Sequence, residues 1–187
     1  KAKKSLKIKT KKKVILFGSI DGGKDRRKGA DLLLEVLKYL NIKKELIQIV
    51  IFGKKNKSQD IFENTLFDVK HLGRINSVNK LSTIYSAADI FIIPSRIESF
   101  GQTAAEAQSC GTPVVGFNIG GLKDIIAHNK NGILIEPFKT KKMALAIGKL
   151  LQEEDKILKF SKASRENALH NWDKKKVAKS HIKFYRS

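Results

Sequence analysis

Short apolar runs alternate with helical patterns along this chain, and this alternation strongly limits the folds that it can adopt. The runs predict strands at residues 13–18, 46–52, 68–72, 89–93, 113–117 and 132–135. Strands that are apolar at nearly every position are typical of a parallel sheet with helices on both faces. The sequence therefore predicts an α/β domain of three layers around a six-stranded parallel sheet. Such sheets bind ligands beyond the carboxyl ends of their strands.

The helical patterns lie between these strands. Five apolar residues recur at the spacing of one helix face: Leu32, Leu33, Val36, Leu37 and Leu40. Ser77 is the expected N-cap of a helix that extends to about residue 87. Another helix is predicted from about residue 101 to residue 109, before Gly111 and Pro113. Asn131 and Gly132 predict a turn, and residues 140–187 predict about three consecutive helices.

The charge is strongly basic, with a formal net charge of +20, and eight of the first 13 residues are lysine. Residues 1–12 are therefore predicted to be a basic linker or a truncated domain boundary that does not pack, and residues 13–187 to form the folded domain. A basic surface is compatible with solvent, with an anionic membrane or with phosphorylated ligands. Aromatic residues do not interleave with the lysines, so no nucleic acid is expected as a partner.

The cellular compartment is predicted from cysteine and hydropathy. The single cysteine, Cys110, excludes an internal disulfide and fits a reducing cytoplasm. No apolar run approaches the roughly 20 residues that span a bilayer, and no apolar segment follows the first lysines as in a signal peptide. We therefore expect a cytoplasmic protein, with peripheral contact at the inner membrane face as an open alternative.

A glycine-rich segment after the first strand partly matches a nucleotide-binding loop. Residues 18–24 fit the first seven positions of a P-loop, but Asp25 stands where Ser or Thr must hold magnesium. The helical pattern also begins too late, near Gly29. The sequence therefore argues against an NTPase.

The most informative stretch is Asp89 to Ala107, which predicts a strand, a loop and a helix. The backbone amides of Gly101, Gln102 and Thr103 are expected to be unpaired at the start of this helix. Free amides at the positive end of a helix dipole form an anion site that suits a diphosphate.

Two glutamates flank this predicted anion site. Glu106 is about four residues inside the helix, roughly 6–8 Å from the amides, which is a suitable reach from a phosphate to a ribose diol. Glu98 precedes the helix, where a sugar hydroxyl is the natural partner. Singly, each has a structural alternative: Ser95 and Glu98 fit a capping box, and Glu106 fits a solvated helix position. Their combination across one strand–loop–helix junction favours a ligand site that both carboxylates face.

The pattern Pro94-Ser-x-x-Glu98-x-Phe-Gly101, with its second glutamate at position 106, resembles the family 4, or group 1, retaining glycosyltransferases. The resemblance covers about residues 14–185 and includes the segments 28–33, 81–89, 106–116, 120–126 and 131–135. It implies a Rossmann-like, nucleotide-sugar-binding domain that is the C-terminal half of a GT-B glycosyltransferase. The N-terminal acceptor domain would then be absent from this chain.

The resemblance also implies roles for individual residues. Glu98 and Lys28 would be catalytic, with Lys28 supplying positive charge to the diphosphate. The family commonly places Arg after the first strand where this chain has Ser19, so Arg26 or, preferably, Arg27 would replace it. The full set of predicted substrate-binding residues is Gly18, Ser19, Arg27, Lys28, Arg74, Ile75, Glu98, Phe100, Gly101, Gln102, Thr103 and Glu106.

For the reaction, the resemblance implies a hexosyltransferase that retains anomeric configuration and needs no metal or other cofactor. The donor would be a UDP-, GDP- or ADP-sugar, and the acceptor a cell-surface glycan or a lipid-linked molecule. Alone, this half would bind donor and transfer nothing. Three alternatives stay open, namely a nucleotide-sugar-binding module without activity, a domain like that of nucleotide-sugar epimerases, and a binder of phosphate-rich ligands or nucleic acid driven by the charge of +20.

Overall fold

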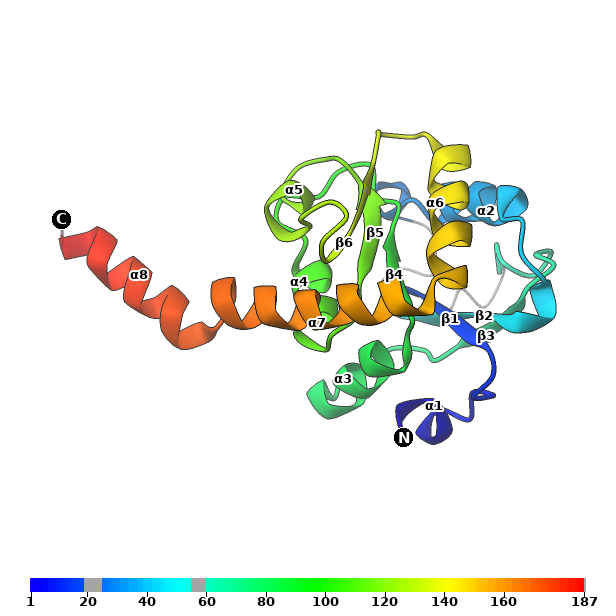
Figure 1. Ribbon diagram of the computed structural model, residues 1–187, viewed down its shortest axis with the longest axis horizontal. Coiled ribbons are helices and arrows are strands. Elements are labelled where there is room, and N and C mark those ends of the chain that lie inside the picture. Colours follow the sequence, from blue (N-terminus) through cyan, green and yellow to red (C-terminus); the bar gives the residue numbers. More distant parts are fainter. Residues whose placement is uncertain (19–24, 55–59, 187) are drawn as a thin grey trace.

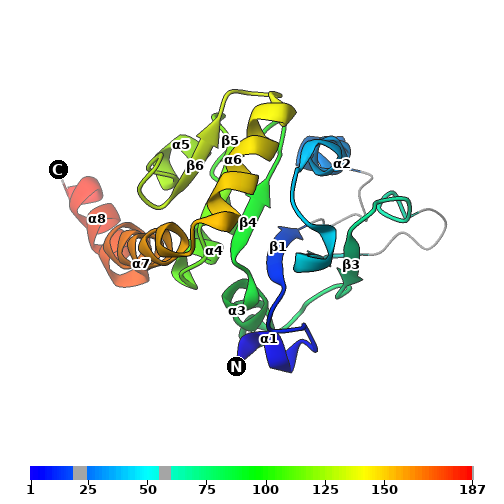
Figure 2. The same ribbon diagram turned by 45° about the vertical axis from the view of Figure 1, so that its right-hand side comes forward.

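The computed structural model describes residues 1–18, 25–54 and 60–186 as one six-stranded sheet covered by helices (Figures 1 and 2). The strands are β1 (Lys13–Gly18), β2 (Ile47–Phe52), β3 (Asp68–His71), β4 (Ile90–Ile93), β5 (Val114–Phe117) and β6 (Gly132–Ile135). All neighbouring strands are parallel, in the order β3-β2-β1-β4-β5-β6. The predicted strands and fold class are confirmed, with boundaries that differ by one residue at most.

Helices cover both faces of the sheet. On one face, α2 (Ala30–Tyr39) and α6 (Thr140–Gln152) bury their apolar sides against alternate strand residues such as Ile15, Ile49 and Ile92. On the other, α3 (Val78–Ala87), α4 (Gln102–Ser109) and α5 (Leu122–Ile125) bury residues such as Leu16 and Phe91. Two short 3-10 helices, η1 (Arg26–Lys28) and η2 (Lys44–Leu46), precede α2 and β2.

The last two helices differ in how they pack. Helix α7 (Glu154–Asn171) follows α6 and buries Ile157 and Phe160, and Asn167 on its polar side donates to the Gln108 side chain of α4 at 2.8 Å. Helix α8 (Lys174–Arg186) projects away from the rest of the molecule (Figure 1) and buries none of its residues. Its aromatic side chains Phe184 and Tyr185 are 75% and 84% exposed.

The lysine-rich N-terminal segment packs against the sheet, contrary to the prediction. It contains a short helix, α1 (Ala2–Ser5), and Ile8 is only 4% exposed. Lys3 forms an ion pair with Asp89 at 2.7 Å, and Asp89 also accepts the backbone N–H of Val14. The apolar contacts of Leu6 and Ile8 and the ion pair with the partly buried Asp89 outweigh the charge of this segment. Its role as a linker or domain boundary stays a prediction.

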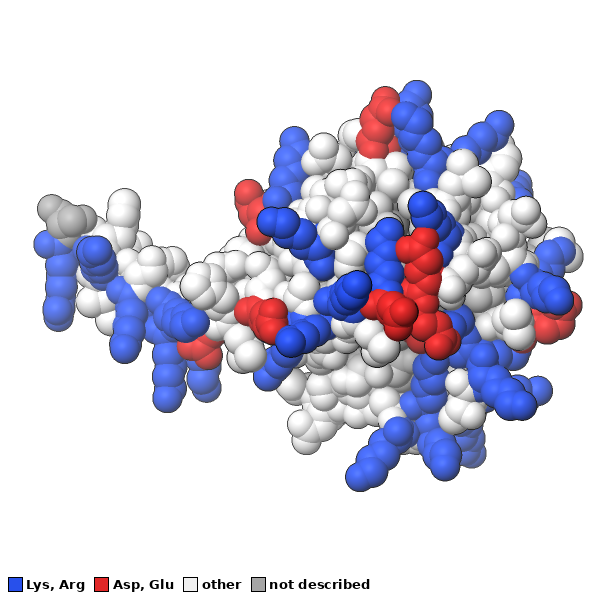
Figure 3. Space-filling model, viewed as in Figure 1, with Lys and Arg blue, Asp and Glu red and all other residues white. Residues whose placement is uncertain are grey.

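The basic side chains are spread over the face of the molecule that Figure 3 draws. Figure 3 shows lysine and arginine on every side of this face and along α8, with fewer acidic side chains among them. On this face, the distribution is typical of a solvated surface rather than of one docking patch. Within the described ranges, no helix is both long enough and apolar enough to cross a membrane.

Candidate functional site

The loop of residues 94–101 connects β4 to α4 at the carboxyl end of the sheet. Gly101 is the N-cap of α4 and has a left-handed backbone, with φ of +93°. A Cβ atom there would lie 2.8 Å from the Leu122 side chain and 3.3 Å from that of Ile125. Glycine is therefore required both by the backbone and by the close contact with α5.

The start of α4 presents unpaired donors. The first backbone amides of the helix that donate are those of Ala104 and Ala105, both to the Gly101 carbonyl. In the described part of the chain, the amides of Gly101, Gln102 and Thr103 have no hydrogen-bond acceptor. The expected set of free amides is therefore present at the positive end of the helix.

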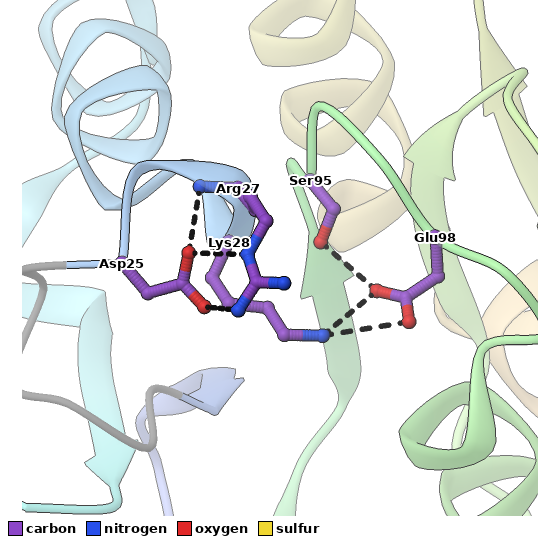
Figure 4. A network of polar contacts seen from close by, with 5 residues as sticks. All are labelled: Asp25, Arg27, Lys28, Ser95 and Glu98. Atoms are coloured by element: carbon purple, nitrogen blue, oxygen red, sulfur yellow. Dashed lines mark hydrogen bonds and ion pairs between the residues drawn. The ribbon is translucent and has the colours of Figure 1, made fainter.

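Lys28 and Glu98 come together beside this helix start, although 70 residues separate them in sequence (Figure 4). The Lys28 ammonium lies 3.1 Å and 3.4 Å from the two carboxylate oxygens of Glu98. The Glu98 side chain is 12% exposed, and that of Lys28 is 29% exposed. The contact places one positive and one negative group, both partly sheltered from water, at the end of β4.

Ser95 fixes the Glu98 carboxylate from the other side. Its buried hydroxyl donates to Glu98 Oε2 at 3.2 Å. No helix begins at Ser95, and α4 starts only at Gln102. The capping-box alternative for Ser95 and Glu98 is therefore wrong, because the carboxylate is directed toward Lys28 rather than toward a helix start.

Two glycines after β5 hold the backbone of Glu98, and the sequence analysis assigned them no role. The Gly121 amide donates to the Glu98 carbonyl at 3.1 Å. A Cβ at Gly120 would lie 1.9 Å from that carbonyl oxygen, and a Cβ at Gly121 would lie 2.5 Å from Phe100 Cα. The two chain segments can touch only because both residues lack side chains.

Arg96 ties the Lys28 segment to the same loop, and its role was also missed. Its guanidinium contacts both carboxylate oxygens of Asp31, at 2.8 and 2.7 Å, and donates to the Arg26 carbonyl. Its backbone amide donates to the Arg27 carbonyl at 2.7 Å. Hydrogen bonding to Arg96 lowers the pKa of Asp31, since it favours the charged carboxylate. No sequence motif signals this contact, because it joins two separate loops.

Arg27, the preferred replacement for the family's usual Arg, points differently from Lys28. The Arg27 guanidinium lies 2.9 Å from each Asp25 oxygen, and its side chain is 71% exposed. This hydrogen bonding lowers the pKa of Asp25. Figure 4 shows Arg27 directed toward Asp25 while Lys28 reaches Glu98. Arg26 is exposed. Participation of either arginine stays a prediction.

Glu106 lies one turn inside α4, in a separate cluster from Glu98. Its carboxylate accepts from the Tyr85 hydroxyl at 3.0 Å and from the Gln102 side-chain amide at 3.2 Å. It lines a groove of about 730 Å³ between α3, α4 and α8, together with Leu81, Phe100 and Trp172. Glu98 is not among the residues lining this groove, so the expectation that both carboxylates face one crevice stays a prediction.

The remaining predicted site residues lie at the carboxyl edge or just beyond it. Gly18 ends β1, and a Cβ there would lie 2.7 Å from the Phe52 ring. Arg74 is exposed and Ile75 half-buried after β3. Phe100 is 44% exposed and packs edge-on against Trp172. Ser19 lies outside the described residues.

No group of three or more His, Cys, Asp or Glu residues that could hold a metal ion occurs in residues 1–18, 25–54 and 60–186. The metal-independent reaction remains a prediction. It would rely on Lys28 and the arginines near it as the cations that contact the diphosphate.

The parallel α/β sheet and the glycine-bounded β4–α4 loop define a Rossmann-like domain with a candidate ligand site at its carboxyl edge. The family described as "Glycosyl transferases group 1" matches residues 1–167, and this chain belongs to that family. The fold is that of one domain of a GT-B glycosyltransferase.

The matches to individual relatives cover only part of the longer proteins. The chain is 39% identical to D-inositol 3-phosphate glycosyltransferase of Corynebacterium urealyticum over 109 residues, which are 58% of this chain and 25% of that protein. Sucrose-phosphate synthase of Thermosynechococcus elongatus superposes with a TM-score of 0.85 at 25% identity, covering 99% of this chain and 47% of that one.

A third similarity is to HepE of Anabaena, solved in complex with UDP and glucose. Its TM-score is 0.79 at 22% identity, over 99% of this chain and 50% of HepE. At this identity the similarity concerns the fold alone. The chain spans about half the length of these two solved proteins and a quarter of the curated relative.

Proposed function

We propose that this domain binds a nucleoside-diphosphate sugar and serves as the donor half of a retaining, metal-independent hexosyltransferase. The observation that carries the proposal is the contact between Lys28 and Glu98 beside the free amides of α4. Family membership supports glycosyl transfer as the activity of the whole enzyme.

The diphosphate would occupy the start of α4. The amides of Gly101, Gln102 and Thr103 offer hydrogen bonds, and the Lys28 ammonium offers a compact positive charge. When the bond between the anomeric carbon and the diphosphate breaks, negative charge grows on the leaving group. Fixed positive groups stabilise that transition state more than the bound donor, which is how they accelerate the reaction.

The sugars would lie on either side of the diphosphate. Glu106, one turn inside the helix, would accept hydrogen bonds from the ribose, and Glu98 would orient the transferred sugar near its anomeric carbon. On donor binding, the Lys28 ammonium would exchange part of its contact with Glu98 for the phosphates. Ser95 already holds the Glu98 carboxylate, and Arg96 already holds the segment that carries Lys28. These contacts reduce the entropic cost of ordering Glu98 and Lys28 when the donor binds.

The acceptor is proposed to be a cell-surface glycan or a lipid-linked molecule, bound mainly by a second domain. The basic surface would favour peripheral contact with an anionic membrane at its cytoplasmic face. This chain alone would therefore bind donor without transferring it.

Calorimetric titration with UDP, GDP, ADP and their glucose conjugates, with and without EDTA, tests the proposal. We expect saturable binding that EDTA leaves unchanged and that Lys28→Met weakens at least about tenfold. A hydrogen bond to a charged group contributes roughly 1.5–3 kcal/mol. Lys43→Met is the matched control. Lys43 is an exposed lysine that precedes η2, at the amino end of β2 and so away from the carboxyl ends of the strands. Equal weakening by both variants, or no saturable binding by the wild type, would contradict the proposal.

A further inference from the structure

Both oxygens of the Glu106 carboxylate are held by side chains from two different positions. The Tyr85 hydroxyl of α3 donates to Oε2 at 3.0 Å, and Gln102 Nε2 donates to Oε1 at 3.2 Å. An ionised carboxylate offers about four lone-pair sites, two on each oxygen. Tyr85 and Gln102 therefore leave one acceptor site on each oxygen, which suits two neighbouring hydroxyl groups.

Tyr85 is itself rigidly placed. The residue is only 1% exposed, and its ring packs edge-on against Phe91 and Phe52, with centroids 5.4 and 5.7 Å away. The buried Thr112 hydroxyl donates to its backbone carbonyl at 2.7 Å. Since the ring and backbone are both fixed, the phenol oxygen defines one position for Glu106 Oε2.

The hydroxyl also keeps its proton. Burial, together with the negative charge of Glu106, raises the pKa of Tyr85 above its ordinary value. A protonated phenol acts as a donor toward the carboxylate, in agreement with the hydrogen bond from Tyr85 to Glu106.

We propose that Tyr85, assisted by Gln102, is a positioning residue that orients the Glu106 carboxylate to accept the vicinal diol of the donor's ribose. The inference rests on the proposed function, because it assigns the ribose to Glu106. It adds that the affinity for ribose hydroxyls depends on a side chain that lies beneath the carboxylate and does not touch the ribose.

The experiment compares Tyr85→Phe with wild type, using whichever of UDP, GDP and ADP binds the wild type most tightly and its 2′,3′-dideoxy analogue. We expect Tyr85→Phe to weaken binding of the ribonucleotide about tenfold, because a Glu106 carboxylate that is no longer oriented would lose about one hydrogen bond to the ribose diol. Binding of the dideoxy analogue should be unchanged, because that ligand has no diol to be oriented. Tyr39→Phe, a half-exposed tyrosine at the end of α2, is the matched control and should change neither affinity.

The outcomes separate the two proposals. Equal weakening for both ligands, or no weakening for either, would overturn the role of Tyr85 while leaving the nucleotide site intact. Absence of saturable binding by the wild type would overturn the proposed function and this inference with it. If Tyr85→Phe does not fold, the exposed Gln102→Leu variant decides, with the same selective loss of ribonucleotide affinity expected.

Discussion

At the scale of single residues, the candidate site is built from charged groups that other side chains hold in place. Lys28 contacts Glu98, Ser95 holds Glu98, and Arg96 joins Asp31 to the Lys28 segment. A side chain with such supports loses less conformational freedom when a ligand arrives than a freely rotating one. The supports are therefore as much a part of the site as the groups that would touch the ligand.

The Arg96–Asp31 contact predicts a dependence of stability on pH. The contact lowers the pKa of Asp31 below its ordinary value of 3.8, so the folded state holds this proton less tightly than the unfolded state. The stabilisation is complete above pH 3.8 and is lost as pH falls through the lowered folded-state pKa. Wild type should therefore be more stable than Asp31→Asn at neutral pH, and this advantage should disappear in strong acid.

Urea unfolding of both proteins across the acid range measures this difference. Comparison with the isosteric Asn isolates Asp31 from the other carboxylates, which titrate in both proteins. An advantage of wild type that is constant down to the lowest pH would contradict the assignment of the contact. The Asp31 side chain is 53% exposed, so solvent screening keeps the effect small.

At the scale of elements, one glycine controls how η1 passes into α2. Gly29 has φ of +68°, and a Cβ atom there would lie 1.9 Å from the Pro94 carbonyl oxygen. Gly29→Ala should lower the free energy of unfolding by about 2 kcal/mol or more, because a left-handed alanine is strained and the two loops must separate. It should also weaken diphosphate binding, since Lys28 is the preceding residue.

Urea unfolding followed by circular dichroism measures the stability, with Gly148→Ala as the matched control. Gly148 lies inside α6, and its added Cβ would meet only Leu40 at 3.7 Å, an ordinary contact. That control should be neutral or slightly stabilising, as for alanine in a helix interior. Similar behaviour of the two variants would rule out a special role for Gly29.

The elements themselves were largely predictable from the sequence, and the site was predictable only in part. Apolar runs such as residues 90–93 identify strands because local periodicity suffices, and Gly101 marks the helix start. The Lys28–Glu98 contact was not predicted as a contact, because it joins residues 70 positions apart. Tyr85 was overlooked because an aromatic residue on an apolar helix face usually belongs to the core. The packing of Ile8 was missed because lysines surround it.

At the scale of the whole molecule, α8 and α7 differ in how much surface they bury against the domain. Helix α8 buries no residue, whereas α7 buries Ile157 and Phe160. Truncation after Asp173 should therefore change the free energy of unfolding by less than about 1 kcal/mol, because little apolar surface leaves the folded state. Truncation after Glu153, which also removes α7, should abolish cooperative unfolding.

Thermal and urea unfolding of the two truncated chains test this difference between the helices. A large loss of stability on removing α8 alone would contradict this prediction. It would show that the contacts of the half-buried Val177 beside the groove contribute more to the free energy of unfolding than the exposure of α8 indicates. The apolar side chains of α8, among them Phe184 and Tyr185, would then have to contact the domain more closely than in this structure.

The strand order has a consequence for how a ligand and the fold depend on each other. β1 and β4 are neighbours, so the first half of the chain forms one wing of the sheet and the second half forms the other. Lys28 belongs to the first wing and Glu98 to the second. A peptide from one half alone cannot form the Lys28–Glu98 contact. A donor that contacts both residues would therefore connect the two wings across the junction of β1 and β4. Such a ligand should raise the melting temperature of the whole sheet in one transition. Nucleotide affinity therefore also reports whether the two wings are assembled.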